Sequence, residues 1–100
     1  MAEYRYLLRG ELDLALAPQV QADLKQIVAS SHAHVLIDCT DLTFIDLMGV
    51  TVLLEAHRDL ETHGRHLLIV NVQDGPQRIF EMLGLGDLLR YDRTRTLQIA

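Results

Sequence analysis

The amino-acid sequence predicts an α/β domain with a largely parallel sheet. Short apolar runs, of the kind found in strands buried on both faces, alternate with segments of about 12 to 18 residues whose apolar positions follow helical spacing. Chains in which such strands and helices alternate form α/β domains with parallel sheets. The 100 residues are enough for one domain, and 49% of them are apolar, so a core can form. We therefore expect a single domain over residues 1–100.

The expected strands differ in how deeply they are buried. From Tyr4 to Arg9 apolar and charged positions partly alternate, which is typical of a half-exposed strand at the edge of a sheet. Residues 10–13 break this alternation and are expected to form a second short extended piece. Residues 35–37 and 67–70 contain only Val, Leu and Ile, which predicts two buried strands. Residues 88–100 allow a short strand followed by the beginning of a helix.

Three amphipathic helices are expected to cover the sheet. The first begins near Pro18, because proline is tolerated in a first helical turn. The second follows Asp46 and stops at Gly64, and the third is closed by Gly84 after an Asp-Gly-Pro start. Their expected buried faces are Val20, Leu24, Ile27 and Val28 in the first helix, Val50, Leu53, Leu54, His57 and Leu60 in the second, and Ile79, Phe80 and Leu83 in the third.

Composition argues against several classes of function. Asp and Glu outnumber Lys and Arg by 14 to 9, and this balance disfavours nucleic acid as a partner, because phosphate binding needs a basic surface. No apolar run approaches the roughly 20 residues that cross a bilayer, so we expect no insertion into a membrane and a cytoplasmic protein. No nucleophile–base pair is apparent in the sequence, so we do not expect an enzyme.

Neither the cysteine nor the histidines predict a metal or cofactor site. Cys39 has no second cysteine to pair with and follows a buried strand, so it is expected to be a small buried hydrophobe. His57 falls on an apolar helical face and is expected to be a hydrogen-bonded core residue. No carboxylate or cysteine at ligand spacing joins the remaining histidines, which are His32, His34, His63 and His66. The chain also has no P-loop, which disfavours a nucleotide site.

Two stretches match a known family in both sequence and spacing. Residues 10–15 read GELDLA, and residues 37–53 read IDCTDLTFIDLMGVTVL. They resemble the GELD element and the strand, Asp-Ser-Ser-Gly, helix signature of STAS domains, the family of the bacterial anti-sigma factor antagonists. The order of elements agrees over residues 4–89. The resemblance implies a small mixed, mostly parallel sheet with amphipathic helices, and a regulatory binding protein whose partner is an anti-sigma factor of the GHKL serine kinase type.

The sequence departs from the family pattern at the serine positions. In the antagonists that this chain resembles, phosphorylation of the second serine of Asp-Ser-Ser-Gly breaks the complex with the anti-sigma factor. Here Leu47 and Met48 replace the two serines, so Met48 stands at the phosphoacceptor position and cannot be phosphorylated. The resemblance implies a partner-binding site at Asp13, Asp46, Leu47, Met48 and Gly49. Leu47 and Met48 either lie exposed as an apolar contact or fold back onto the sheet as relics of a lost switch.

The residues around this pair also have structural interpretations. Asp46 is expected to cap the second helix, and Gly49 to permit a close approach of backbone or partner. Asp13 either touches the partner or caps the turn before the first helix. Thr43 and Thr51 flank the loop, and neither is expected to offer a free hydroxyl in place of the missing serine.

Two classes of function stay open. The leading hypothesis is an antagonist that binds an anti-sigma factor kinase without being phosphorylated at the usual serine site. The alternative is a STAS subunit of an ABC-type lipid transport complex that contacts the ATPase, because loss of the serine removes the need for a phosphorylation switch. An exposed Leu47–Met48 pair is also compatible with a homodimer.

Overall fold

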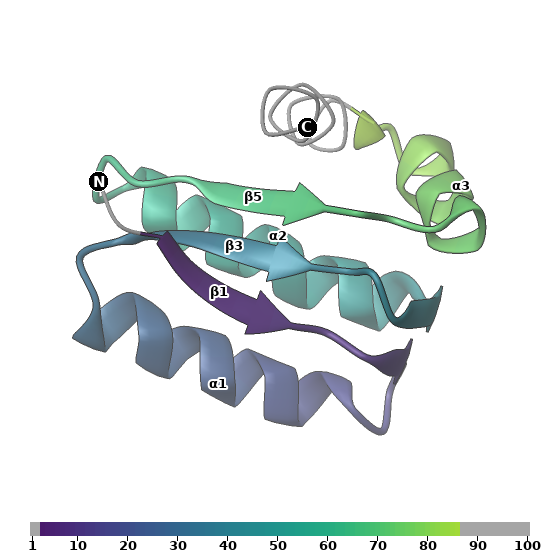
Figure 1. Ribbon diagram of the computed structural model, residues 1–100, viewed down its shortest axis with the longest axis horizontal. Helices are drawn as coiled ribbons and strands as arrows, with labels where there is room; N and C mark the ends of the chain where they lie inside the picture. The colour runs from purple at the N-terminus through teal and green to yellow at the C-terminus, as the bar shows by residue number, and fades with distance from the viewer. Residues whose placement is uncertain (1–2, 87–100) are drawn as a thin grey trace.

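The computed structural model describes residues 3–86, which form five strands and three helices (Figure 1). In chain order the elements are β1 (Glu3–Leu7), β2 (Gly10–Leu12), α1 (Ala17–Ser30), β3 (His34–Asp38), β4 (Leu42–Ile45), α2 (Leu47–Glu61), β5 (Leu67–Val70) and α3 (Asp74–Met82). The strands and helices predicted within residues 3–86 are all present. The strand and helix predicted for residues 88–100 fall outside the described part of the chain.

All strand pairs that the structure describes are parallel. β1, β3 and β5 form one sheet in that order, with Tyr4 opposite Val35 and Val35 opposite Leu67. β2 and β4 form a second, two-stranded sheet in which Glu11 lies opposite Phe44. The prediction of a largely parallel sheet is therefore confirmed. The prediction of an edge strand is confirmed as well, because β1 pairs only with β3 among the described strands.

The strand β4 is not apparent from the sequence. Only its end residues Leu42 and Ile45 are buried, whereas Thr43 and Phe44 between them are exposed. A strand with one buried face would bury every second residue, so this pattern gives no strand signal. β4 is defined instead by its backbone pairing with the equally short β2.

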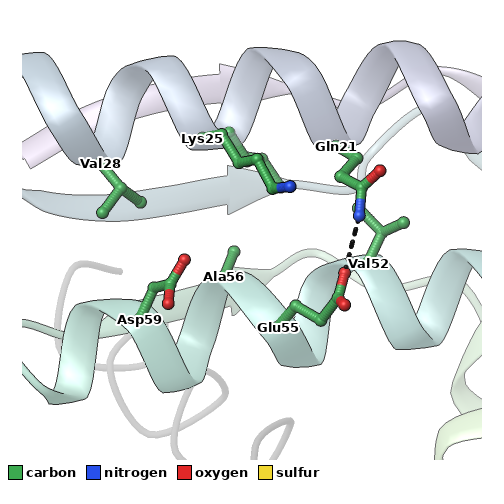
Figure 2. Close-up of a pocket in the computed structure, with 8 residues that line it drawn as sticks. Gln21, Lys25, Val28, Val52, Glu55, Ala56 and Asp59 are labelled. Atoms are coloured by element: carbon green, nitrogen blue, oxygen red, sulfur yellow. Dashed lines mark hydrogen bonds between the residues drawn. The ribbon is translucent and has the colours of Figure 1, made fainter.

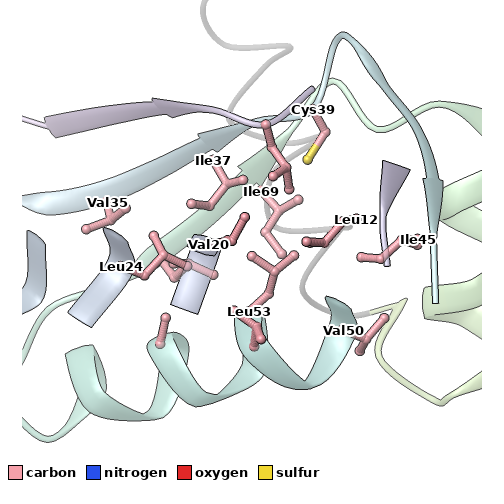
Figure 3. Packing of buried hydrophobic residues seen from close by; sticks show 14 of the residues in the cluster. Leu12, Val20, Leu24, Val35, Ile37, Cys39, Ile45, Val50, Leu53 and Ile69 are labelled. Carbon is pink, nitrogen blue, oxygen red and sulfur yellow. The ribbon is translucent and has the colours of Figure 1, made fainter. Parts of the chain in front are cut away.

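The main core lies between the larger sheet and the two long helices, α1 and α2, which pack side by side (Figures 1 and 3). Val35, Ile37 and Ile69 of the sheet belong to the same buried cluster as Leu24 of α1 and Leu53 of α2. A smaller buried cluster, formed by the strand residues that alternate with these, consists of Leu36, Leu68 and Val70. The larger cluster fixes the two helices on the sheet.

The buried face of α2 differs from the predicted one. Val52 and Ala56, which were not in the predicted face, are buried, whereas Leu54 and His57, which were, are only half-buried. The cause is the neighbouring helix: Val52 and Ala56 face α1 (Figure 2), which adds a second contact beside the sheet. The prediction is also wrong at Leu83, which follows α3 and is exposed.

The predicted ends of the helices are confirmed. Pro18 lies in the first turn of α1. Gly64 follows α2 with a φ of 70°, and Gly84 follows α3 with a φ of 75°. Left-handed backbone of this kind favours glycine and ends a helix.

A buried arginine, which the sequence does not single out, joins the end of α1 to the start of β5. Arg65 is 9% exposed, and its guanidinium donates to the backbone oxygens of Val28 (2.8 Å), Ser31 and Ala33 (3.4 Å). The last carbonyls of a helix have no partner within the helix. Arg65 therefore supplies hydrogen bonds that α1 cannot make for itself.

Candidate functional site

The start of α2 rests directly on the end of β2. The backbone N–H of Asp46 donates to the carbonyl of Leu12 at 3.2 Å. A Cβ atom on Gly49 would lie 2.6 Å from the Leu12 oxygen and 2.8 Å from Cγ1 of Ile45. Such distances leave no room for a side chain, so Gly49 is required by a close approach to backbone within the domain. The structure thus confirms a close approach at Gly49.

Asp46 caps α2, as predicted. Its backbone is extended, with φ −113° and ψ −174°, and its Oδ1 accepts a 3.0 Å hydrogen bond from the N–H of Gly49. Carboxylates in this position satisfy one of the free N–H groups of the first helical turn. The cap defines where α2 begins and therefore places the two residues that follow it.

Asp13 caps the turn before α1, which was one of the two roles predicted for it. Its Oδ1 accepts from the N–H groups of Ala15 (3.0 Å) and Leu16 (3.2 Å), and its carbonyl oxygen accepts from Ala17 (2.8 Å). These bonds shape the turn between β2 and α1. Contact of Asp13 with a partner stays a prediction.

Leu47 and Met48, the first two residues of α2, are exposed. Their exposed fractions are 64% and 47%, so they do not fold back onto the sheet, and that interpretation is wrong. The nearby threonine hydroxyls already make hydrogen bonds to backbone oxygens, as predicted. Thr43 Oγ1 donates to the Gly10 carbonyl at 3.1 Å, and Thr51 Oγ1 donates to the Leu47 carbonyl at 2.8 Å. The start of α2 therefore presents an apolar surface with no free serine or threonine hydroxyl among the residues described there.

Two further exposed apolar residues, which were not predicted, lie in segments that adjoin the start of α2. Leu14, in the turn after β2, is 67% exposed, and Phe44 of β4 is 47% exposed. Leu14 belongs to residues 10–15 and Phe44 to residues 37–53, the two stretches that resemble the family motifs. Their exposure could not be read from the sequence, because apolar residues in such segments are usually buried.

A buried carboxylate, also missed in the sequence, ties together the loops behind the site. Asp38 Oδ1 accepts from the Thr40 hydroxyl (2.6 Å), the Thr40 N–H (3.0 Å) and Asn71 Nδ2 (3.2 Å), and its Oδ2 accepts from Arg5 (2.7 Å). Burial alone would raise the pKa of Asp38, but the hydrogen bonds, those from Thr40 foremost, hold the pKa of this carboxyl well below its usual range. The network therefore joins the carboxyl ends of β3 and β5 to the middle of β1.

The histidines and the cysteine form no metal cluster among residues 3–86. His34 and His66 stack with ring centroids 5.1 Å apart, and the His66 N–H donates to His34 Nδ1. His57 places Nε2 3.4 Å from Glu61 Oε1, but its buried Nδ1 has no hydrogen-bond partner. The expectation of a hydrogen-bonded core histidine is thus only partly met. Cys39 is fully buried, which agrees with its predicted role as a small hydrophobe.

Two hollows on the helical side of the domain do not include Leu47 or Met48 among their lining residues. The one between α1 and α2, of about 10 Å³, is no larger than one water molecule needs (Figure 2). The other, of about 540 Å³, opens at the far ends of these helices beside Arg65 and His63. Within residues 3–86 we also find no helix long and apolar enough to span a bilayer. Leu47 and Met48 therefore lie outside these two hollows, on the exposed surface at the start of α2.

These features define a small parallel α/β domain that presents an apolar helix start beside the ends of two short strands. The model of the STAS domain matches residues 5–97, so the chain belongs to the STAS domain family. The family and the α/β fold that the sequence motifs implied are therefore confirmed.

Curated relatives of this chain include bacterial regulators. An anti-sigma-B factor antagonist of Listeria monocytogenes is 29% identical over 80 residues, which cover 80% of this chain and 70% of that protein. An anti-sigma-B factor antagonist of Staphylococcus aureus is 24% identical over 86 residues, covering 86% of this chain and 80% of that protein.

Solved structures share the fold. The anti-sigma factor antagonist SpoIIAA in its unphosphorylated form superposes with a TM-score of 0.78 at 24% identity, covering 94% of this chain and 89% of SpoIIAA. SpoIIAA in the phosphorylated form gives 0.69 at 24% identity, with 86% and 78% covered. A sulfate transporter family protein from Wolinella succinogenes gives 0.73 at 20% identity, with 87% and 70% covered.

Proposed function

We propose that this chain is an anti-sigma factor antagonist that binds an anti-sigma factor of the GHKL serine kinase type and is not phosphorylated at the usual serine position. The exposed apolar pair Leu47–Met48 at the start of α2 is the observation that carries the proposal. The names of the Listeria and Staphylococcus relatives support the antagonist role. The proposal makes the chain a regulatory binding protein of the bacterial cytoplasm rather than an enzyme.

The residues of the proposed site divide into contact and positioning residues. Leu47 and Met48 touch the partner, because they are the exposed members of the set. Asp46 and Gly49 set the position of α2 through the cap and the close approach to Leu12. Asp13 shapes the turn before α1 beside them.

The absence of a hydroxyl at position 48 determines how the complex responds to the kinase. A phosphoryl group adds about −1.5 to −2 charges at neutral pH and disrupts an apolar interface by its desolvation cost. Met48 cannot accept this group, and the Thr43 and Thr51 hydroxyls are bonded to backbone oxygens. The complex therefore persists in the presence of ATP, and control has to act on the amount of antagonist or on another protein.

A binding and phosphorylation experiment tests the proposal. The purified chain is titrated against the purified anti-sigma kinases encoded in the same genome by calorimetry, with and without Mg-ATP, and phosphate incorporation is measured. Wild type is expected to bind equally with and without ATP and to incorporate no phosphate. Met48→Leu keeps the apolar contact and should bind, whereas Met48→Asp should lose at least tenfold in affinity. Binding of the ATPase of a lipid transporter, and of no anti-sigma factor, would contradict the proposal.

A further inference from the structure

The outer edge of β1 has no strand beside it within residues 3–86, where β1 pairs with β3 alone. Successive residues of a strand direct their N–H and C=O groups alternately toward its two edges. The Leu8 N–H donates to the Asp38 carbonyl at the end of β3, at 3.0 Å, so every second residue back along β1 also directs its backbone toward β3. Arg5 and Leu7, which lie between those residues, therefore direct their backbone groups to the open edge.

The strand β1 lacks two of the devices that prevent pairing at a sheet edge. It contains no proline, and its register with β3 runs from Glu3 to Leu7 without a bulge. Its charged residues lie on the face of the sheet opposite α1, because they alternate with Tyr6, which bonds to α1. Arg5 on that face is bonded to Asp38. The edge can therefore accept another strand.

A hollow of about 340 Å³ lies beside this edge, between β1 and α1, which run next to each other (Figure 1). It is lined by two tyrosines from the strand and by four residues from the helix, namely Tyr4, Tyr6, Asp23, Gln26, Ile27 and Ser30. A strand added to β1 would direct every second side chain to the α1 side of the sheet, where the hollow lies. In recognition of this kind, main-chain hydrogen bonds give affinity and pockets for alternate side chains give specificity.

The residues that line the hollow suit a cationic side chain. Asp23 is the one charged residue among them, and its oxygens accept from the Tyr6 hydroxyl (2.7 Å) and from Gln19 Nε2 (2.8 Å). Burial and the bond to Asp23 raise the pKa of Tyr6 well above its usual value, so this hydroxyl remains a donor. A carboxylate accepts about four hydrogen bonds, so Asp23 can accept more than these two. Tyr4, which is 45% exposed, adds an aromatic ring of the kind that attracts ammonium and guanidinium groups.

From this arrangement we infer that the edge of β1 binds an extended segment of a partner protein, which pairs with β1 as a further strand and places a Lys or Arg side chain in the hollow beside Asp23. None of the residues that line the hollow belongs to the site at the start of α2, so the inference goes beyond the proposed function and does not depend on it. A second copy of this chain is a poorer occupant. A two-fold antiparallel pairing of β1 with itself would place tyrosines over the hollow, because Arg5, the one cation within β1, lies on the other face.

A synthetic peptide and the full chain test the inference. The probe is a short labelled peptide in which Thr and Val alternate and Lys replaces the central Val. Binding is measured by fluorescence anisotropy, and amide NMR spectra of the chain locate it. The amide signals of Arg5 and Leu7 are expected to shift on binding. A peptide with Glu in place of Lys, and a Lys peptide that is N-methylated at every second residue on its pairing edge, should each bind at least about tenfold more weakly.

Two pairs of matched variants separate the backbone contribution from the charge. Arg5→Pro removes the N–H that faces the open edge and leaves the bonds to β3, since proline is tolerated where a strand N–H faces solvent. Arg5→Ala loses the same side chain but keeps the N–H. Arg5→Pro should therefore bind the Lys peptide about fivefold more weakly than Arg5→Ala. Asp23→Asn should bind it about tenfold more weakly than wild type, whereas Asp59→Asn, an exposed charge on α2, should match wild type. Thermal melting establishes that each variant is folded.

Three results would overturn the inference. The first is that the Lys peptide does not bind the wild-type chain. The second is that the N-methylated peptide or the Glu peptide binds as well as the Lys peptide, or that Asp23→Asn binds the Lys peptide as wild type does. The third is a concentration-dependent dimer of the wild-type chain that Arg5→Pro abolishes and Arg5→Ala does not, which would assign the edge to a second copy.

Discussion

The replacement of Gly49 by alanine is the sharpest test of the close contact between the start of α2 and the end of β2. The new Cβ would lie 2.6 Å from the Leu12 carbonyl oxygen, 2.7 Å from Leu12 Cγ and 2.8 Å from Ile45 Cγ1. One of these atoms belongs to the backbone, so a change of side-chain rotamer cannot relieve the clash. Forcing an extra methyl group into such a contact costs about 1 to 3 kcal/mol or more. The helix-propensity gain of alanine over glycine, at most about 1 kcal/mol, is too small to offset it.

Urea denaturation of wild type and Gly49→Ala measures the difference in the free energy of unfolding. Gly75→Ala is the matched control, because Gly75 also lies in the first turn of a helix and its Cβ would be 4.0 Å from the Thr43 oxygen, an ordinary contact. We expect Gly49→Ala to be destabilised by about 1 to 3 kcal/mol and Gly75→Ala to be unchanged or slightly more stable. If Gly49→Ala and Gly75→Ala have the same free energy of unfolding, the close contact between the start of α2 and the end of β2 is refuted.

Three further predictions concern named interactions. Arg65→Ala should lower the free energy of unfolding by about 2 to 4 kcal/mol in urea, because three backbone oxygens lose a charged donor. Asp46→Ala should cost about 0.5 to 2 kcal/mol through loss of the cap and should weaken partner binding as well. The pKa of Asp38 is lower in the folded chain than in the unfolded one, so its carboxylate stabilises the fold above the usual aspartate pKa and this contribution is lost as the pH falls toward the folded pKa. Urea midpoints from pH 7 to pH 3 should therefore fall more steeply for wild type than for Asp38→Asn.

Most of the fold could be predicted because its signals are local. The strands β3 and β5 are short runs of Val, Leu and Ile, and Pro18, Gly64 and Gly84 mark helix ends by their backbone preferences. What the sequence could not show depends on distant contacts. The buried face of α2 is rotated toward Val52 because α1 packs beside it, and this contact is between elements far apart in the sequence.

The candidate site was predicted in part for the same reason. Asp46 acts through the N–H three positions along the chain, and Gly49 lies against Leu12, which belongs to the other of the two motifs; the structure gives both residues the expected role. The exposure of Phe44 was not predicted, because it follows from the pairing of β2 with β4. The spacing of apolar residues in the sequence does not indicate this pairing. Arg65 was missed because its acceptors lie more than 30 residues away along the chain.

The most direct test of the central claim is to restore the missing hydroxyl. Wild type and Met48→Ser are each mixed with the anti-sigma kinase and Mg-ATP, and phosphate incorporation and complex dissociation are followed over time. The account predicts that wild type stays bound and unphosphorylated, whereas Met48→Ser is phosphorylated and released. Phosphorylation and release of the wild-type chain would contradict it.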